Sequence, residues 1–410
     1  MAERINLADN VGCCGCTACM AACPKGCIAM ERNAEGFLYP RVDGEACVSC
    51  GLCVKACPLR AGRESLKKMP VARSLVATNA DESVRAASTS GGAFNALARQ
   101  VLEEGGVVFG AAFDDRWRVV HTSARDDAGL ISFSGSKYVQ SDLANRDVYR
   151  SAADLLDKGT PVLFSGTPCQ VAGLNTFLSA RRVKAEGLTT VDFICRAVPS
   201  PAMWEEYVAY LSERYGSKPS SVSFRKKTYG YHSSTMSIAF ENGKLYRGSG
   251  RVCPMHKAFF AGLSTRPSCA HCAFRAPERA SDLTLFDCWS YASLTGLADD
   301  DRGHTHVWAR TTRASEMLSR AEAAGELKLV DVDMGRVLKG DGVMATRDFD
   351  ESPRRADFFA RAEREGFLSA ADKYAHVSMK DRAVESAKGV LSAMGLMRFL
   401  TAKRRGRASK

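Results

Sequence analysis

The chain has 410 residues, 45% of them hydrophobic, and a formal net charge of +11 at pH 7. This length predicts two or three domains with a large buried core, and no apolar run is long enough to predict a transmembrane helix. Residues 380–410 carry nine Lys or Arg against Asp381 and Glu385, so the charge is mostly a property of the tail and does not mark a nucleic-acid binder.

The amino-terminal residues contain no apolar signal core before the first cysteine motif at residue 13. Sixteen cysteines without an export signal indicate a reducing compartment, where thiols act as metal ligands instead of forming disulfides. We therefore expect a cytoplasmic protein.

Residues 1–62 contain a duplicated cysteine motif, C-x2-C-x2-C-x3-C-P. This spacing is typical of bacterial dicluster ferredoxins, in which three cysteines of one copy and the last cysteine of the other hold each 4Fe–4S cluster. The first predicted ligand set is Cys13, Cys16, Cys19 and Cys57. The second set is Cys47, Cys50, Cys53 and Cys23. The residues between the copies, with FLY and a turn at Gly36, predict a small hairpin.

Zinc is the alternative metal, because paired C-x2-C segments also bind zinc. Zinc does not require a third cysteine at the same spacing or the Cys-Pro pairs, which are Cys23-Pro24 and Cys57-Pro58. The tandem motif therefore favours two 4Fe–4S clusters and a function in electron transfer.

After a basic linker at 63–73, strand-like and helix-like segments alternate from about residue 74. This alternation predicts an α/β main domain with a mixed, partly parallel sheet over 74–370, preceded by the small α+β ferredoxin-like domain. Residues 221–250 are rich in strand-like sequence and suggest an antiparallel extension of that sheet.

Four further cysteines suggest another metal site in the main domain. Cys269 and Cys272 form a C-x2-C pair, and Cys169 and Cys195 each follow an apolar strand. The carboxyl ends of strands are where open α/β sheets bind ligands, so these four thiols could hold a third 4Fe–4S cluster. The alternative is that Cys169 and Cys195 are small buried residues. The remaining cysteines comprise two rival ligands, Cys253 and Cys288, and two without an expected role, Cys14 and Cys27.

Two polar segments are candidate cofactor sites. The first, Ser88, Thr89, Ser90, Gly91 and Gly92, precedes a predicted helix whose free amides could bind a phosphate. An ordinary helix cap by Ser90 is the alternative. The second segment, 135–141, supplies Ser136, Lys137, Tyr138 and Gln140, and a solvated turn is its alternative. The histidines show no spacing that indicates a metal site.

These motifs resemble the beta-subunit family of coenzyme F420-reducing hydrogenases and dehydrogenases, in the bacterial form with a fused dicluster ferredoxin. The resemblance covers residues 11–289 and rests on STSGG (88–92), GSKYVQS (135–141), FSGTPCQVAGL (164–174), ICRAVPSP (194–201), SFRKK (223–227), RPSCAHCAF (266–274) and the segment from 279 to 289.

The resemblance implies an α/β domain that binds FAD beside an additional 4Fe–4S cluster, with electrons passing between the ferredoxin clusters, that cluster and the flavin. STSGG and GSKYVQS would line the flavin pocket, and Cys169, Cys195, Cys269 and Cys272 would hold the third cluster. The expected function is a flavin-dependent oxidoreductase that acts on a small molecule and exchanges electrons with a redox partner. The alternative is a subunit without a substrate site that relays electrons to a partner enzyme.

Two segments depart from the family pattern. Cys195-Arg196-Ala197 replaces Cys-His-Gly, and residues 286–290, FDCWS, replace Gly-Asp-Phe-Trp-Gly. Both changes remove glycines, which allow close approach of the backbone to a cofactor. We therefore expect either an altered substrate side or a flavin that is held differently. The resemblance to the bacterial fused form also implies that F420 itself is not the expected substrate.

The carboxyl-terminal tail, 371–410, is basic and amphipathic. Ala387, Val390, Leu391, Met394, Met397 and Leu400 lie on one predicted helical stripe, and KRRGR follows at 403–407. A helix docked on the main domain is the default expectation. The alternative is peripheral contact with the inner face of an anionic membrane, which clustered basic residues favour.

Overall fold

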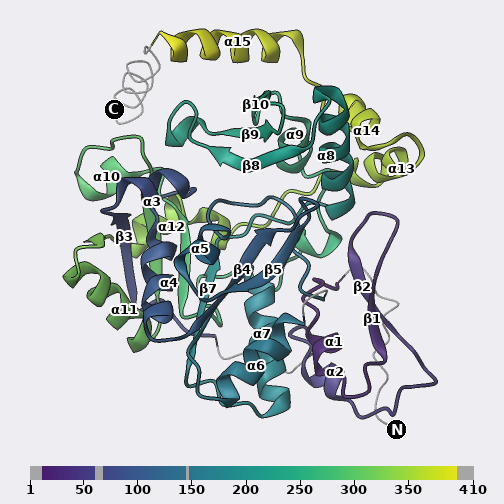
Figure 1. The fold of residues 1–410 in the computed structure, drawn as a ribbon, viewed down its shortest axis with the longest axis vertical. Coiled ribbons are helices and arrows are strands. Elements are labelled where there is room, and N and C mark those ends of the chain that lie inside the picture. Colours follow the sequence, from purple (N-terminus) through teal and green to yellow (C-terminus); the bar gives the residue numbers. More distant parts are fainter. Residues whose placement is uncertain (1–11, 61–67, 145–146, 395–410) are drawn as a thin grey trace.

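The structure is a computed structural model that describes residues 12–60, 68–144 and 147–394. Figure 1 shows a small amino-terminal unit beside one end of a large α/β domain, with a second sheet and the carboxyl-terminal helices above it. This arrangement confirms the predicted mixed α/β domain preceded by a ferredoxin-like unit.

The amino-terminal unit consists of two short helices and one hairpin. Its elements are α1 (Ala18–Ala22), β1 (Ile28–Arg32), β2 (Leu38–Val42) and α2 (Leu52–Lys55). The two strands pair in antiparallel register, with Ile28 opposite Val42, and Gly36 forms the turn with a φ of 83°. Each helix follows the first cysteines of one motif, as a duplicated cluster-binding loop requires.

An eight-stranded mixed sheet forms the centre of the main domain, in the order β13-β3-β12-β11-β7-β6-β4-β5. The strands β4, β6, β7 and β11 are parallel, and antiparallel strands flank them on both sides. The bounds are β3 (Arg73–Asn79), β4 (Val107–Phe113), β5 (Val119–Ala124), β6 (Val162–Ser165), β7 (Leu188–Phe193), β11 (Leu283–Asp287), β12 (Thr305–Ala309) and β13 (Leu327–Asp331).

Helices cover both faces of this sheet because successive residues of its buried strands point to opposite sides. On β4, Val107 and Phe109 join the core under α6 and α7, whereas Val108 joins the core under α4 and α11. The helices concerned are α4 (Ala93–Glu103), α6 (Val148–Asp157), α7 (Pro168–Arg181) and α11 (Thr312–Ala323). The main domain also contains four shorter helices, which are α3 (Glu82–Ala87), α5 (Asp127–Ile131), α10 (Tyr291–Thr295) and α12 (Met334–Lys339).

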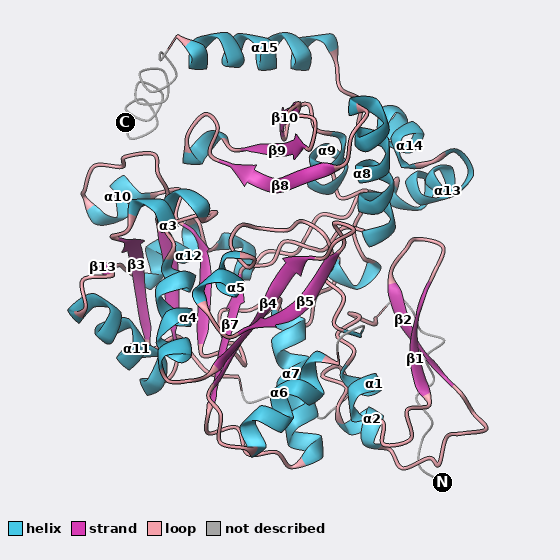
Figure 2. Cartoon of the chain, in the orientation of Figure 1, coloured by secondary structure: helices cyan, strands magenta, loops and turns pink. Residues whose placement is uncertain are grey.

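The strand-rich region near 221–250 forms a separate sheet, so the predicted extension of the main sheet is wrong. Its three antiparallel strands are β8 (Pro219–Lys226), β9 (Thr235–Phe240) and β10 (Leu245–Ser249). A turn with Gly243 at a φ of 80° separates β9 from β10. Its apolar side chains join those of α8 (Pro201–Tyr215) and α9 (Pro254–Phe260) in a core cluster that also includes Val119 of β5. Figure 2 shows α8 and α9 beside the small sheet.

The carboxyl-terminal helices are α13 (Arg355–Glu365), α14 (Phe367–Tyr374) and α15 (Met379–Ala393). Polar contacts attach helix α15 to the small sheet. The Glu385 carboxylate accepts hydrogen bonds from the backbone N–H and the hydroxyl of Ser249 at 3.0 and 2.6 Å. Val390 and Met394 stay 60% and 64% exposed, whereas the predicted Met397 and Leu400 lie outside the described residues. In the described ranges, no helix has both the length and the apolar character needed to cross a membrane.

Candidate functional site

A cavity of about 540 Å³ opens where the parallel strands end, between the main sheet and the small sheet. Ser165 ends β6, Phe193 ends β7 and Asp287 ends β11, and all three line it. Carboxyl ends of parallel strands meet at one edge of a sheet, which explains why segments far apart in sequence meet there. The cavity size is typical of a site for a small molecule or cofactor.

Both predicted polar segments line this cavity and contact each other. The backbone N–H of Ser136 donates to Thr89 Oγ1 at 2.6 Å, and the two hydroxyl oxygens are 3.0 Å apart. The predicted residues on the wall are Ser88, Thr89, Ser90, Gly92, Ser136, Lys137 and Tyr138. The fold therefore brings two segments separated by more than forty residues into one site.

Two predicted residues have other positions. Gly91 packs against neighbouring strands, because a Cβ there would lie 2.7 Å from the Ala77 carbonyl oxygen and the Thr305 nitrogen. The Gln140 amide donates to the Cys14 carbonyl oxygen at 2.9 Å and thus contacts the ferredoxin-like loop. Gly91 and Gln140 are absent from the cavity wall.

The first turn of α4 faces the cavity without a side-chain cap. Its N-cap is Gly92, with a φ of 81°, and Ser90 instead places its hydroxyl 3.0 Å from Thr305 Oγ1. Cap formation by Ser90 was the alternative expected from sequence, and the structure does not show it. The unpaired amides at this 11-residue helix's start can bind an anion.

Lys137 supplies a cation to the same cavity. Its ammonium donates to the carbonyl oxygens of Ser132, Ser134 and Gly135 at 3.0, 3.2 and 3.3 Å. Burial lowers the pKa of Lys137 to about 7. Among the described residues, no carboxylate lies within ion-pair distance of this ammonium, so an anionic ligand could neutralise it.

Two histidines on the cavity wall carry unpartnered nitrogens, and sequence analysis did not identify either one. Burial lowers the pKa of His121 to about 4 and that of His256 to about 3, so both are neutral at pH 7. His121 Nδ1 and His256 Nε2 have no hydrogen-bond partner among the described residues. These nitrogens are available to a polar ligand, and only their positions in the fold reveal this.

At the mouth of the cavity, an aromatic and charged group joins the two sheets. Arg225 of β8 pairs with Asp287 of β11, and the Tyr231 hydroxyl donates to the same carboxylate at 2.9 Å. The Trp289 ring stacks on Tyr231 with centroids 4.5 Å apart and is 40% exposed. An exposed indole at a cavity mouth offers a planar apolar surface to a ring-shaped ligand.

The four cysteines predicted for a third cluster lie together beside this cavity. Burial, together with the neighbouring Cys169 and Cys272 thiols, raises the pKa of Cys269 to about 12. Cys195 lines the cavity. Burial raises the pKa of its thiol, and the nearby thiols of Cys269, Cys169 and Cys272 add to this rise. The rivals lie elsewhere, with Cys253 next to Met236 Sδ at 3.6 Å and Cys288 near Asp341. Four grouped thiols that are largely buried are suited to a metal cluster.

The ferredoxin-like cysteines form the two predicted sets. In the first, burial and the nearby Cys13 and Cys57 thiols raise the pKa of Cys19. In the second, Cys47, Cys50 and Cys53 surround a cavity of about 150 Å³ together with Cys23 and Cys27. Cys57 thus lies with the first copy and Cys23 with the second, as exchange of the last ligand between copies requires.

Buried polar contacts attach the first cysteine set to the main domain. The fully buried Arg266 donates to the carbonyl oxygens of Cys13 and Leu38 at 2.7 and 3.0 Å and to Gln140 Oε1 at 2.9 Å. Cys14, which had no expected role, makes side-chain contacts with both Cys16 and Cys169. The first cysteine set therefore adjoins the cysteine group beside the large cavity.

Comparisons with known proteins agree with this architecture. Residues 12–61 match the 4Fe-4S dicluster domain. Residues 74–145 match the amino-terminal part of the coenzyme F420 hydrogenase/dehydrogenase beta subunit, and residues 159–334 match the carboxyl-terminal part of the same family. No curated protein matches the sequence.

One similar solved structure is a chain of the F420-reducing NiFe hydrogenase complex from Methanosarcina barkeri, at 17% identity and a TM-score of 0.43. The match covers 74% of this chain and 91% of that chain. The two beta-subunit matches together cover more than half of the chain, and the dicluster match covers its amino-terminal unit. The protein therefore belongs to the coenzyme F420 hydrogenase/dehydrogenase beta-subunit family, as an iron–sulfur electron-transfer member with an amino-terminal 4Fe–4S dicluster domain.

Proposed function

We propose that the protein is an iron–sulfur flavoprotein oxidoreductase that passes electrons between its ferredoxin-type clusters and a flavin in the 540 Å³ cavity. The proposal rests on one observation, which is that three features line the same cavity. They are the uncapped start of α4, Lys137, and Cys195 of the four-cysteine group. Helix amides and an ammonium suit the pyrophosphate of FAD, and the cysteine group places an electron carrier next to it.

The residues present fit a bound flavin in three respects. Lys137 and the amides of α4 offer positive charge, while His121 and His256 offer unpartnered nitrogens for the polar edge of a ring. Aromatic and apolar side chains, including Tyr138 and Trp289, form other parts of the wall. A bound flavin would supply the conversion between hydride transfer and single-electron transfer.

The protein would hold the redox centres in a spatial order that leads from its surface to the cavity. The second cysteine set lies at the surface, where Cys50 is exposed and Val48 is 58% exposed. The first set is packed under α7, and the contact of Cys14 with Cys169 leads to the group beside the cavity. We infer that a partner protein exchanges electrons at the Cys50 surface and that a small-molecule substrate reacts at the Trp289 end of the cavity.

Anaerobic purification followed by cofactor extraction and iron analysis tests this function. We expect one FAD and about twelve irons per chain, because three 4Fe–4S clusters hold four irons each. Lys137→Met should weaken FAD binding without loss of iron, whereas Lys158→Met, at an exposed lysine after α6, should change neither. Full iron content without flavin, together with electron exchange with a partner protein, would contradict the proposal and favour a relay subunit without a substrate site.

A further inference from the structure

At one edge of the large cavity, which Asp341 lines, three potential metal ligands converge that have no role in the proposed iron–sulfur and flavin sites. Cys288 follows β11, His306 lies on β12 and Asp341 follows α12. One ligand atom from each lies within 4.8 Å of the other two. Cys288 and His306 are fully buried, and the Asp341 side chain is 6% exposed.

Pairing of β11 with β12 brings two of the three ligands together. Phe286 and His306 are opposite each other in the β11–β12 ladder, and the backbone N–H of Cys288 donates to the His304 carbonyl oxygen at 3.2 Å. Residues two apart on a strand share a face, so Phe286, Cys288 and His306 lie on the same side of the sheet. The Phe286 ring stacks on the His306 ring with centroids 4.7 Å apart, which holds the imidazole plane.

The carboxylate of Asp341 is oriented by Ser290. The Ser290 backbone N–H donates to Oδ2 and its hydroxyl donates to Oδ1, both at 2.9 Å. His306 Nε2 lies 3.0 Å from the same Oδ2. Such outer-shell hydrogen bonds to a ligating carboxylate are a regular feature of protein metal sites.

The electrostatic balance favours a divalent cation. As zinc ligands, a cysteine thiolate, an imidazole and a carboxylate together carry two negative charges, which one dication would neutralise. Among the described residues, Asp341 has an ion-pair partner only in His306, and no lysine or arginine reaches it.

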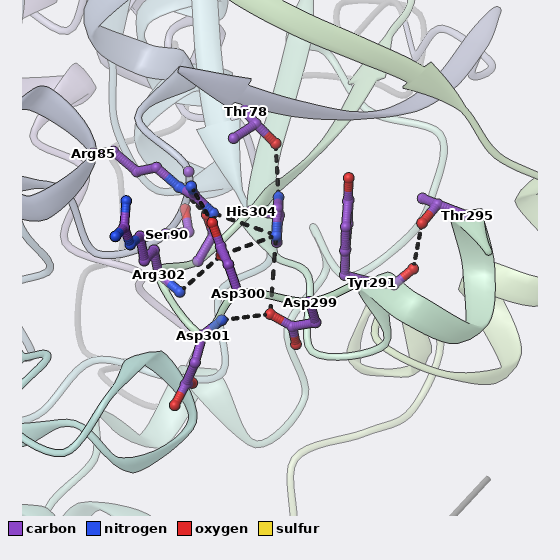
Figure 3. Close-up of polar contacts among 12 residues, drawn as sticks. Thr78, Arg85, Ser90, Tyr291, Thr295, Asp299, Asp300, Asp301, Arg302 and His304 are labelled. Atoms are coloured by element: carbon purple, nitrogen blue, oxygen red, sulfur yellow. Dashed lines mark hydrogen bonds and ion pairs between the residues drawn. The ribbon is translucent and has the colours of Figure 1, made fainter. Parts of the chain in front are cut away.

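A neighbouring group of similar composition shows the contrast. Asp299, Asp300 and His304 also bring their ligand atoms within 4.8 Å of one another. In Figure 3 the Arg85 guanidinium points into this group, and it donates to both oxygens of Asp300 at 2.6 Å. That group already contains a cation, whereas the group around Asp341 does not.

We propose that Cys288, His306 and Asp341 bind one zinc ion, separate from the iron–sulfur sites, with a fourth position for water or for a group of the cavity ligand. Zinc accepts sulfur, nitrogen and oxygen ligands in tetrahedral geometry, and its bond lengths imply separations of about 3.2 to 3.8 Å between ligand atoms. Asp341 lines the large cavity, which gives the ion a route of entry. Binding releases the thiol proton to solvent and changes no oxidation state.

Zinc analysis of the full-length protein, purified anaerobically from zinc-supplemented cells, tests the site without any assay of activity. We expect about one zinc per chain, and zinc K-edge absorption should show one sulfur at about 2.3 Å and nitrogen or oxygen ligands at about 2.0 to 2.2 Å. The zinc edge is separate from that of iron, so the clusters do not interfere. A shell of three or four sulfurs would place the zinc in a cysteine-cluster site and overturn the proposal.

Variants separate this site from adventitious zinc. Cys288→Ser should remove the sulfur shell and the bound zinc, whereas Cys253→Ser, at an equally buried thiol, should retain both. Ser290→Ala keeps all three ligands and should weaken zinc binding about 10- to 100-fold in equilibrium dialysis with zinc-65. The iron content should stay the same in all three variants. Undiminished zinc binding by Cys288→Ser and Ser290→Ala, or no zinc in the unmodified protein, would overturn the proposal, and neither result depends on flavin or on a third cluster.

Discussion

The side chain of Cys14 contacts that of Cys169, and this contact joins the ferredoxin-like loop to the cysteine group of the main domain. Cys14 follows Cys13 directly in the chain, so one peptide bond separates a predicted cluster ligand from this contact. The Arg266 and Gln140 hydrogen bonds surround the same loop and hold it in place. These contacts connect the ferredoxin-like loop directly to the cysteine group beside the large cavity.

The exchanged ligand predicts which cluster a cysteine variant damages. Because Cys57 lies with Cys13 and Cys19, Cys57→Ala should disturb the first cluster and leave the second intact. EPR spectra of the reduced protein can separate the two signals. Selective loss of the cluster held by Cys47, Cys50 and Cys53 would show that the ligand assignment is wrong.

The cysteine group beside the cavity predicts a defined loss of iron. Cys195→Ser removes one of four grouped thiols, so the purified protein should lose about four irons while both ferredoxin-type signals persist. Cys253→Ser is the matched control, because that thiol lies in the core of the small sheet and should leave the iron content unchanged. Equal iron contents in the two variants would argue against a third cluster.

The tight contact between α7 and the first cysteine loop predicts that Gly173 does not accept a larger residue. A Cβ at this position would lie 2.9 Å from Cys16 Sγ and 3.0 Å from the Tyr149 hydroxyl. Gly173→Ala gains about 1 kcal/mol of helix propensity, yet overpacking costs about 1 to 3 kcal/mol, so a net loss of stability is expected.

Thermal unfolding and the EPR signal of the first cluster measure this effect. Gly187→Ala serves as the control, since its Cβ would meet no atom closer than 3.5 Å. An unchanged melting temperature and an unchanged signal in Gly173→Ala would contradict the packing argument.

The lowered pKa of Lys137 predicts a pH dependence of flavin binding. An anionic ligand binds the ammonium form, so FAD affinity should fall as pH rises through 7, and Lys137→Met should flatten this profile. His121 and His256, with pKa values of about 4 and 3, do not titrate in this range. Fluorescence titration of FAD from pH 6 to pH 9 measures the effect, and identical profiles for the two proteins would rule it out.

The same lysine predicts how stability without ligand depends on pH. Its pKa in the folded state is about 7, against 10.5 in the unfolded chain, so the unfolded state binds more protons between these values. The free energy of unfolding therefore rises as pH increases from 7 toward 10.5, because the cost of burying a charged Lys137 disappears when the lysine is neutral. Chemical denaturation of Lys137→Met should show a shallower rise over this window than the unmodified protein, and parallel curves would contradict the assignment.

The position of α15 predicts an effect of the carboxyl-terminal segment on membrane binding. Polar residues such as Glu385 hold the helix on the small sheet, which leaves Val390 and Met394 exposed. We expect the full-length protein to sediment with anionic vesicles at low salt, and a protein without residues 379–410 to stay in solution. Binding by neither protein, or by both equally, would show that this segment is only a docked helix.

Local spacing within the sequence was sufficient to predict the 4Fe–4S dicluster domain and the strand–helix alternation of the main domain. The cysteine motif identifies this domain because the predicted ligands all lie in two copies of one short loop. Their spacing along the chain is therefore enough to indicate 4Fe–4S clusters. The hairpin at Gly36 was also predictable, since its turn requires a local backbone conformation.

Only the tertiary structure decided which distant residues share a site. Gln140 belongs to a segment predicted to bind flavin, yet the fold turns its amide toward Cys14. His121 and His256 have no sequence signal, because their roles depend on burial beside a cavity formed by two sheets. Cys288, His306 and Asp341 are separated by 18 and 35 residues in the chain, yet β-strand pairing and the segment after α12 bring one ligand atom of each within 4.8 Å of the others. Spacing can specify a local loop, whereas convergence of distant side chains follows from the packing of the whole chain.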